Sequence, residues 1–229
     1  MTGGPPLGQD GPVVDAVVFD LDGVIVDSEP VWEEVRRAYV AAHGGSWQPD
    51  TQRRLMGMST GEWAHYLSGE LGVRRSAGQV ADEVVREMAR RYTEHVPLID
   101  GADEVVRRLA ARWPLGLASS SPTRLIAAAL DATGLTGAFG ATLSTEETER
   151  GKPAPDVYLD VARRLGVDPT RCAAVEDSSN GVRSAAAAGM RVVAVPHLSY
   201  PLDPDAAGLA VVTLGSIGEL TPELVQGLG

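Results

Sequence analysis

Short apolar runs alternate with longer segments of helical period over the second half of the chain. The runs occupy residues 115–118, 141–143, 172–175 and 192–195, and another at 13–19 comes near the start. Each is the length of a buried strand, and each adjoins an amphipathic or alanine-rich segment typical of a helix. This alternation predicts an α/β fold with a parallel sheet and helices on both faces.

The pattern changes between residues 30 and 96. Three segments in this stretch have helical period, and none reads as a strand. We therefore expect two sheet-forming parts, 12–29 and 97–229, to build one domain, with 30–96 inserted as a helical lobe on two linkers. The Gly- and Pro-rich residues 1–11 are expected to be disordered.

Local signals place several helix ends. Ser121 followed by Pro122 predicts an N-cap and a first helical residue. Gly134, Gly166 and Gly189 stand where helices would end in the left-handed conformation.

The composition of the chain argues against some classes of function. The chain has 229 residues, 44% of them hydrophobic, and a formal net charge of −11. An acidic protein with no basic run lacks the footprint of a nucleic-acid or anionic-membrane partner. The sequence has a single cysteine, Cys172, and no signal-peptide pattern. No apolar run approaches the roughly 20 residues that a membrane helix needs. We therefore predict a cytoplasmic protein, and we expect it to be a monomer or a weak homodimer.

Polar side chains follow the predicted strands. Asp20 and Asp22 follow the first, Ser119 the second, and the pair Glu176-Asp177 the fourth, while Lys152 lies in the segment after the third. Because parallel strands end at one edge of a sheet, these groups should meet there. Carboxylate oxygens are the ligands that Mg²⁺ prefers, and a carboxylate not used by the metal can attack phosphorus. A second acid can transfer a proton, and lysine and serine can hold phosphoryl oxygens. This set of side chains therefore favours phosphoryl transfer.

Four motifs now carry a family resemblance. DLDGVIVDSEP, LASSS, GKPAPD and VEDSSNGVRSAAAAGM, in this order, resemble the motifs of the haloacid dehalogenase-like superfamily, in its β-phosphoglucomutase-like and phosphatase branch. The resemblance spans the chain from Val13 to about Pro196. It implies a Rossmann-like core with a helical cap.

The resemblance also implies roles. Asp20 would be the nucleophile and Asp22 the general acid and base. Asp20, the Asp22 carbonyl, Asp177 and Glu176 would bind Mg²⁺. Ser119 and Lys152 would hold the phosphate, with Ser120 beside them.

Particular residues distinguish among the reactions that members of this family catalyse. Dehalogenases of the family lack the second acid, which is present here as Asp22. The cap of phosphonoacetaldehyde hydrolases supplies a lysine, and residues 30–96 contain none. The family's phosphoglucomutases carry a histidine, a lysine and an arginine where this chain has Trp32, Met56 and Thr60, so the cations for a second phosphate are missing.

We therefore predict an Mg²⁺-dependent phosphatase for a small, sugar-phosphate-like monoester. In that case Trp32 and the loop residues Gly57, Met58 and Ser59 would bind its organic part, although Met56 and Met58 as cap core are an equal alternative. A β-phosphoglucomutase-type mutase stays open, as does a non-hydrolytic phospho-acceptor or binding module. The four histidines show no ligand spacing.

Overall fold

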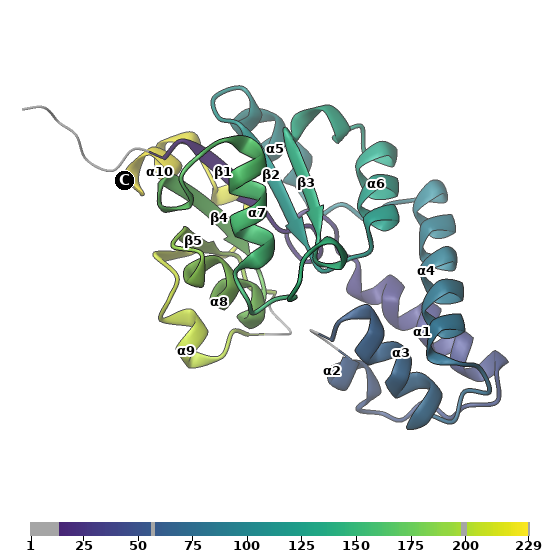
Figure 1. Ribbon diagram of the computed structural model, residues 1–229. Helices are drawn as coiled ribbons and strands as arrows, with labels where there is room; N and C mark the ends of the chain where they lie inside the picture. Colours follow the sequence, from purple (N-terminus) through teal and green to yellow (C-terminus); the bar gives the residue numbers. More distant parts are fainter. Residues whose placement is uncertain (1–13, 56–57, 198–200, 229) are drawn as a thin grey trace, which may run out of the picture.

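A six-stranded, entirely parallel sheet forms the centre of the protein (Figure 1). The computed structural model describes residues 14–55, 58–197 and 201–228. The strand order is β3-β2-β1-β4-β5-β6. The strands are β1 (Ala16–Phe19), β2 (Leu115–Ser119), β3 (Ala141–Ser144), β4 (Cys172–Glu176), β5 (Arg191–Ala194) and β6 (Val212–Thr213).

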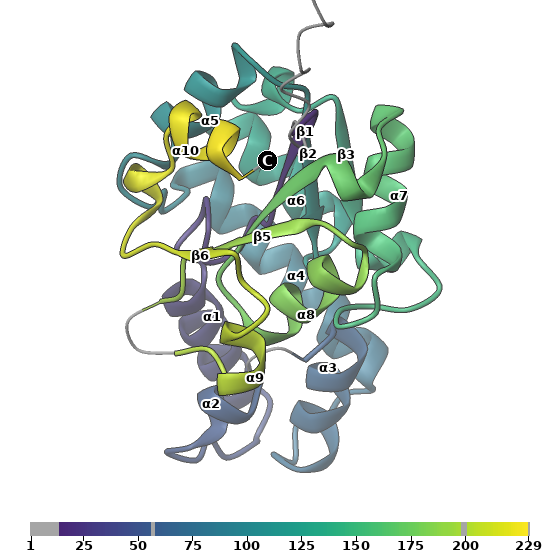
Figure 2. The same cartoon turned by 90° about the vertical axis from the view of Figure 1, so that its left-hand side faces the viewer.

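Both faces of the sheet are covered by helices, as Figure 2 shows. Along β1, Val17 and Phe19 pack into one hydrophobic cluster with α5 (Ala102–Ala110) and α6 (Thr123–Ala132). Ala16 and Val18 point the other way, into a second cluster. That second cluster contains residues of α7 (Asp156–Leu165), α8 (Ser179–Ala187) and α9 (Pro204–Ala207). Successive side chains of β1 point to opposite faces of the sheet, and both faces are covered, so every residue of the strand is buried and apolar.

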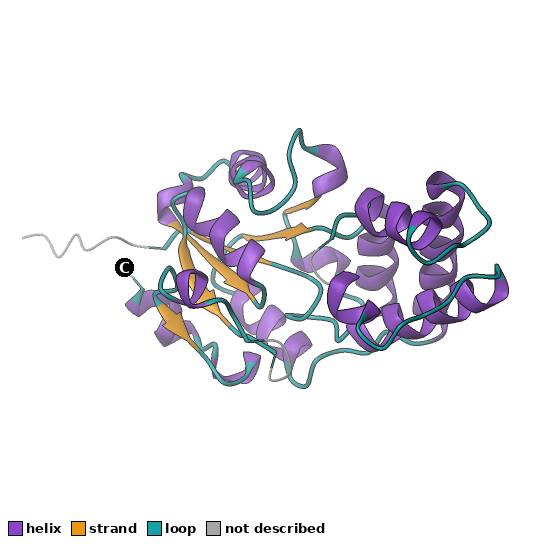
Figure 3. Cartoon of the chain, turned by 90° about the horizontal axis from the view of Figure 1, so that it is seen from below, coloured by secondary structure: helices purple, strands orange, loops and turns teal. Residues whose placement is uncertain are grey.

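A group of helices lies beside the sheet rather than on it (Figure 3). They are α1 (Glu29–Ala42), α2 (Thr51–Leu55), α3 (Thr60–Gly69) and α4 (Ala77–Glu94). No strand occurs among the described residues between 30 and 96. The remaining helix is α10 (Pro222–Gly227), and 3₁₀ turns occur at Thr136–Ala138, Thr145–Glu147, Pro169–Arg171 and Ile217–Glu219. The part of the chain that is described contains no helix long and apolar enough to cross a membrane.

Most predicted elements are present, with two corrections. Strand β6 was not predicted, because two residues at a sheet edge give no periodic signal. Ser121 does not cap α6: the residue before the helix is Pro122, whose side chain makes no cap hydrogen bond, and the backbone N–H of Thr123 donates to Oε2 of Glu146 at 3.2 Å instead. Gly134, Gly166 and Gly189 have the expected positive φ of 64°, 72° and 82°. The segment 1–11 and the start of the first predicted strand lie outside the described residues.

One glycine sets how closely a helix lies on the sheet. A Cβ built on Gly116 in β2 would come 2.3 Å from Cγ1 of Val161 in α7. Only a residue without a side chain lets the helix pack at this distance. Because α7 follows the Lys152 segment, this contact also positions the lysine.

We expect Gly116→Ala to lower the free energy of unfolding by about 1–3 kcal/mol, since the added methyl group overpacks a close contact. Gly78→Ala is the matched control, because Gly78 lies in α4 with open space around its Cα. Its free energy of unfolding should rise by about 0.4–1 kcal/mol. Urea denaturation measures both, and equal stability of the Gly116 variant and the native protein would contradict the close-packing argument.

Candidate active site

The predicted site residues meet at the carboxyl edge of the sheet. Asp20 follows β1, Ser119 ends β2, Glu176 ends β4, and β1 lies between β2 and β4 where the strand order reverses. Crevices beyond such reversal points are the usual ligand sites of open α/β sheets. Here a cavity of about 160 Å³ lies between this edge and the helices α1–α3. Its size is below the range of drug-sized ligand sites and favours a small ligand.

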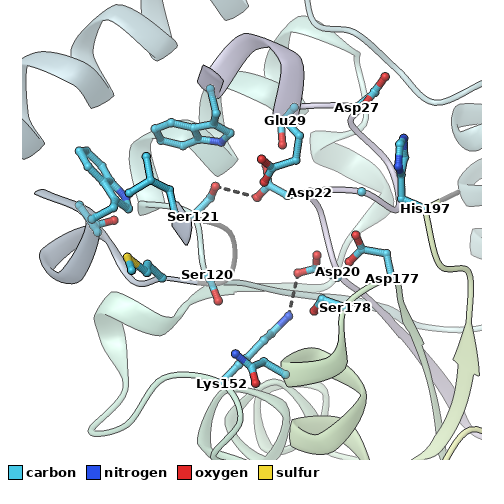
Figure 4. A pocket seen from close by; sticks show the side chains of 18 of the residues that line it. Asp20, Asp22, Asp27, Glu29, Ser120, Ser121, Lys152, Asp177, Ser178 and His197 are labelled. Carbon is cyan, nitrogen blue, oxygen red and sulfur yellow. Dashed lines mark hydrogen bonds and ion pairs between the residues drawn. The ribbon is translucent and has the colours of Figure 1, made fainter. Parts of the chain in front are cut away.

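Lys152 connects three strands at this edge. Its Nζ donates to Oδ1 of Asp20 at 2.8 Å, to the carbonyl of Ala118 at 3.0 Å and to Oε1 of Glu176 at 2.6 Å. Figure 4 shows the ammonium directed at the Asp20 carboxylate. It is the only lysine in the sequence. One buried cation is thus shared by two buried carboxylates.

The charges in this cluster shift one another's titration. Burial lowers the pKa of Lys152, but the carboxylates of Asp20 and Glu176 outweigh it and the pKa rises above its ordinary value. Burial raises the pKa of Asp20, with Lys152 opposing, and burial also raises that of Asp177, with the neighbouring Asp20 adding to the effect. The negative charge therefore exceeds what one lysine compensates.

This excess fits a divalent cation. Asp20, Glu176 and Asp177 each present a carboxylate oxygen within 4.8 Å of the others. The Asp177 side chain makes no hydrogen bond or ion pair with any residue that the structure describes, so its oxygens are open to a ligand. Oxygen donors grouped in this way suit Mg²⁺.

Glu176 is already supplied with donors. Besides Lys152, the Tyr158 hydroxyl donates to its Oε1 at 2.5 Å and the Ser178 hydroxyl to its Oε2 at 3.2 Å. The residue is 0% exposed. These contacts suit a group that holds Lys152 in place better than a group that binds metal.

Gly23 brings the loop after β1 against Asp177. Its φ is +79°, and a Cβ there would lie 1.9 Å from Oδ2 of Asp177. The turn and the close approach both require glycine. Gly23 directly follows Asp22 in the motif that also contains Asp20.

Asp22 faces the cavity from the side of the serines (Figure 4). Its Oδ2 accepts from the Ser121 hydroxyl at 2.7 Å and from the Ser119 hydroxyl at 3.3 Å. Ser119 is 0% exposed, whereas Ser120 and Ser121 line the cavity. The second acid is therefore held apart from Lys152 by its own hydrogen bonds.

The opposite wall comes from the helices α1–α3 and the loop before α3. Trp32 and Met58, both predicted to contact the organic part of a substrate, line the cavity, as does Thr60. Ser59 lies in an adjoining cleft and caps α3, with its hydroxyl accepting from the backbone N–H of Glu62. The predicted residue Gly57 and its neighbour Met56 lie outside the described residues.

Several cavity residues were not predicted from the sequence. They are Glu29, Arg36, Trp63, Asn180 and His197, and Tyr158 supports the site from α7. A signal existed for two of them: positions 29, 32 and 36 have the 3–4 spacing of one helix face, which would have placed Glu29 and Arg36 beside Trp32. Trp63 had no such local signal.

Comparisons with known proteins identify similar sequences and structures. Residues 14–189 match the family model for haloacid dehalogenase-like hydrolases. Hexitol phosphatase B of Escherichia coli is 35% identical over 93% of this chain and 96% of its own length. The phosphorylated carbohydrates phosphatase of Thermotoga maritima is 31% identical over 92% of this chain and 95% of its own length. The crystal structure of a putative β-phosphoglucomutase from Thermotoga maritima superposes with a TM-score of 0.71, at 30% identity over 94% of this chain and 98% of that one.

The different surroundings of the two neighbouring acids give a prediction. Substitution of a residue that only supports a metal ligand typically weakens metal binding about 10- to 100-fold. Asp177→Asn should weaken Mg²⁺ binding by more than this, whereas the effect of Glu176→Gln should stay within this range. Titration calorimetry with Mg²⁺ measures both. Glu223→Gln in α10 is a control that should leave Mg²⁺ affinity unchanged. A larger effect from Glu176→Gln would reverse the two roles.

Proposed function

The chain belongs to the haloacid dehalogenase-like hydrolases, and from that membership we propose that it is an Mg²⁺-dependent phosphatase acting on small phosphomonoesters of the sugar-phosphate kind. The observation that carries the proposal is the grouping of Asp20, Lys152, Glu176 and Asp177 at one strand edge. The named relatives, which include a hexitol phosphatase and a phosphorylated carbohydrates phosphatase, support this substrate class.

The proposed reaction begins at Asp20. Lys152 hydrogen-bonds to its Oδ1, so Oδ2 is the oxygen that attacks phosphorus. As the Asp20–phosphorus bond forms, the bond from phosphorus to the substrate oxygen breaks, and Asp22 gives its proton to that oxygen. The products of this half are the free alcohol and a phosphorylated Asp20.

The second half returns the enzyme to its starting state. Water attacks phosphorus, Asp22 takes the proton of the water, and the bond to Asp20 breaks to release inorganic phosphate. Asp20, Asp177 and the backbone carbonyl of Asp22 would hold Mg²⁺, which when bound neutralises phosphoryl oxygens and orients the group. Ser119, Ser120 and Lys152 are proposed to hold the same oxygens.

The surroundings of the site fit hydrolysis better than phosphoryl transfer between two sugar positions. Trp32, one of the three positions that differ from the mutases, lies against Trp63 at 5.9 Å between ring centroids rather than offering a cation. Thr60, another of the three, lines the cavity and carries no charge. A mutase must hold a second phosphate with cations, and these positions supply none.

We also propose the setting in which the enzyme acts. Its partner is a small phosphate ester and not a nucleic acid or a membrane, since the net charge is −11. We place it in the cytoplasm as a monomer or weak homodimer, with residues 30–96 as a cap on the core formed by 12–29 and 97–229. Burial raises the pKa of the Cys172 thiol to about 11, consistent with an inert core cysteine.

The purified protein should release inorganic phosphate from p-nitrophenyl phosphate and from sugar phosphates, and this release should require Mg²⁺ but no bisphosphate activator. Excess EDTA should abolish it because the acid cluster needs a divalent cation, and Ca²⁺ should inhibit because its coordination shell is larger and less regular. A malachite-green phosphate assay measures the release. Full activity in EDTA would remove the metal from the proposal, and interconversion of β-glucose 1-phosphate and glucose 6-phosphate without phosphate release would favour the mutase.

Asp22→Asn should slow hydrolysis of alkyl phosphates about 10²–10⁴-fold, because their alkoxide leaving groups need a proton. The loss should be smaller in the first step with p-nitrophenyl phosphate, since p-nitrophenolate leaves without protonation. The variant should then accumulate label on Asp20 that is stable to acid and labile to hydroxylamine.

Rapid-quench single turnovers with both substrates measure the two steps of this variant. Equal loss on both substrates, with no trapped phosphoenzyme, would assign Asp22 a structural or metal-binding role instead of proton transfer.

A further inference from the structure

Arg36 is a buried cation in the wall of the active-site cavity. It is 5% exposed, and it lines the cavity together with Trp32 and Glu29. All three belong to α1 at positions 29, 32 and 36, so they share one face of the helix. Neither the reaction nor the metal site described above uses this arginine.

The guanidinium of Arg36 has no polar partner within the described chain. It forms no hydrogen bond or ion pair there, and its Nε is fully buried without a partner. Its contacts are instead with two indole rings: the Cζ atom lies 4.4 Å from the ring centroid of Trp32 and 4.9 Å from that of Trp63. The rings fix the side chain and leave its donors unpaired.

Such an arrangement is unfavourable for the protein alone. Burial lowers the pKa of Arg36 to about 10, with Glu29 and Asp22 opposing, so the side chain keeps its charge at neutral pH. A cation–π contact contributes roughly 0.5–2 kcal/mol, which does not replace the hydrogen bonds that a buried guanidinium loses. The missing acceptors are best supplied by a bound ligand.

The neighbouring charges indicate which ligand fits. Glu29 lies on the same helix face, and its Oε2 accepts from Nε2 of Gln52 in α2 at 2.6 Å, which holds the carboxylate in place. A second phosphate beside Arg36 would be repelled by the Glu29 carboxylate on the same helix face, and one arginine cannot offset both the phosphate and this carboxylate. A hydroxyl group both accepts and donates, so it can satisfy arginine and glutamate together.

We propose that Arg36 determines substrate specificity by donating hydrogen bonds to hydroxyl oxygens of a neutral polyol or sugar chain, while Glu29 accepts hydrogen bonds from the same hydroxyl groups. This inference rests on the proposed function, because it assigns the part of the ester that does not react. A ligand without hydroxyl groups would leave the buried donors unpaired, and sites of this kind discriminate strongly against such ligands.

Arg36→Met tests the proposal, since it removes the charge and the donors but keeps an unbranched side chain. The measured quantity is the ratio of kcat/KM for a polyol or sugar ester to kcat/KM for p-nitrophenyl phosphate, which has no hydroxyl group. The ester is the one that the native enzyme hydrolyses best among sorbitol 6-phosphate, mannitol 1-phosphate, fructose 1-phosphate and glucose 6-phosphate. We expect the ratio to fall about 10- to 100-fold, the range for a hydrogen bond to a charged group.

Matched variants separate specificity from folding. Arg37→Met removes the same charge from the exposed next residue of α1 and should keep the ratio. Arg36→Lys should recover only part of it, because lysine lacks the planar fork of donors. The Tm of Arg36→Met should equal or exceed that of the native protein, because a buried unpaired charge is removed.

An unchanged ratio in Arg36→Met would contradict this role of Arg36, as would a native enzyme that hydrolyses p-nitrophenyl phosphate but none of the four esters. A loss of activity confined to fructose 1,6-bisphosphate would also contradict it, because Arg36 would then bind a second phosphate. Calorimetry in an Asp20→Asn background separates this result from failure of the proposed function. There, Arg36→Met should weaken binding of sorbitol 6-phosphate about 10- to 100-fold. If the native protein released phosphate from no ester, the proposed function would fail, and this binding difference would still decide the role of Arg36.

Discussion

The contact on which the rest of the site depends is the buried ammonium of Lys152. It joins the ends of β1 and β4 through Asp20 and Glu176, and it reaches β2 through the carbonyl of Ala118. Without this cation two buried carboxylates would face each other in a medium that screens charge poorly. Glu176 in turn is held by Tyr158 and Ser178, so the position of the lysine is set by four separate parts of the chain.

The two halves of the cavity suit different parts of a substrate. The sheet edge supplies fixed charges, which suit a phosphoryl group common to every substrate of the reaction. Helices α1 and α3 supply Trp32, Arg36 and Trp63, and the loop before α3 supplies Met58; the chemistry of these side chains suits the part of a substrate that varies. The close approach of Gly23 to Asp177 couples the two, because the chain runs from that glycine directly into α1.

The sheet edge could be predicted from the sequence, and the helical wall only in part. Asp20, Asp22, Ser119, Lys152 and Asp177 each follow an apolar run, so the period-2 geometry of strands and the shared edge of a parallel sheet place them together. Trp63 and Gln52 come from separate short helices whose orientation depends on tertiary packing. Arg36 was hidden for another reason: in the pair Arg36-Arg37 it reads as surface charge, and only the face shared with Glu29 and Trp32 distinguishes it.

The single lysine has a further consequence for the chemistry of the surface. Every other basic side chain of Lys or Arg type in the sequence is an arginine, so the exposed cations are guanidinium groups that stay charged at any pH the fold tolerates. An amine-selective reagent has one side-chain target in this sequence, and that target is 6% exposed and bonded to two carboxylates. Acylation of the lysine side chain would therefore report the opening of this buried charge cluster, without a background from other side chains.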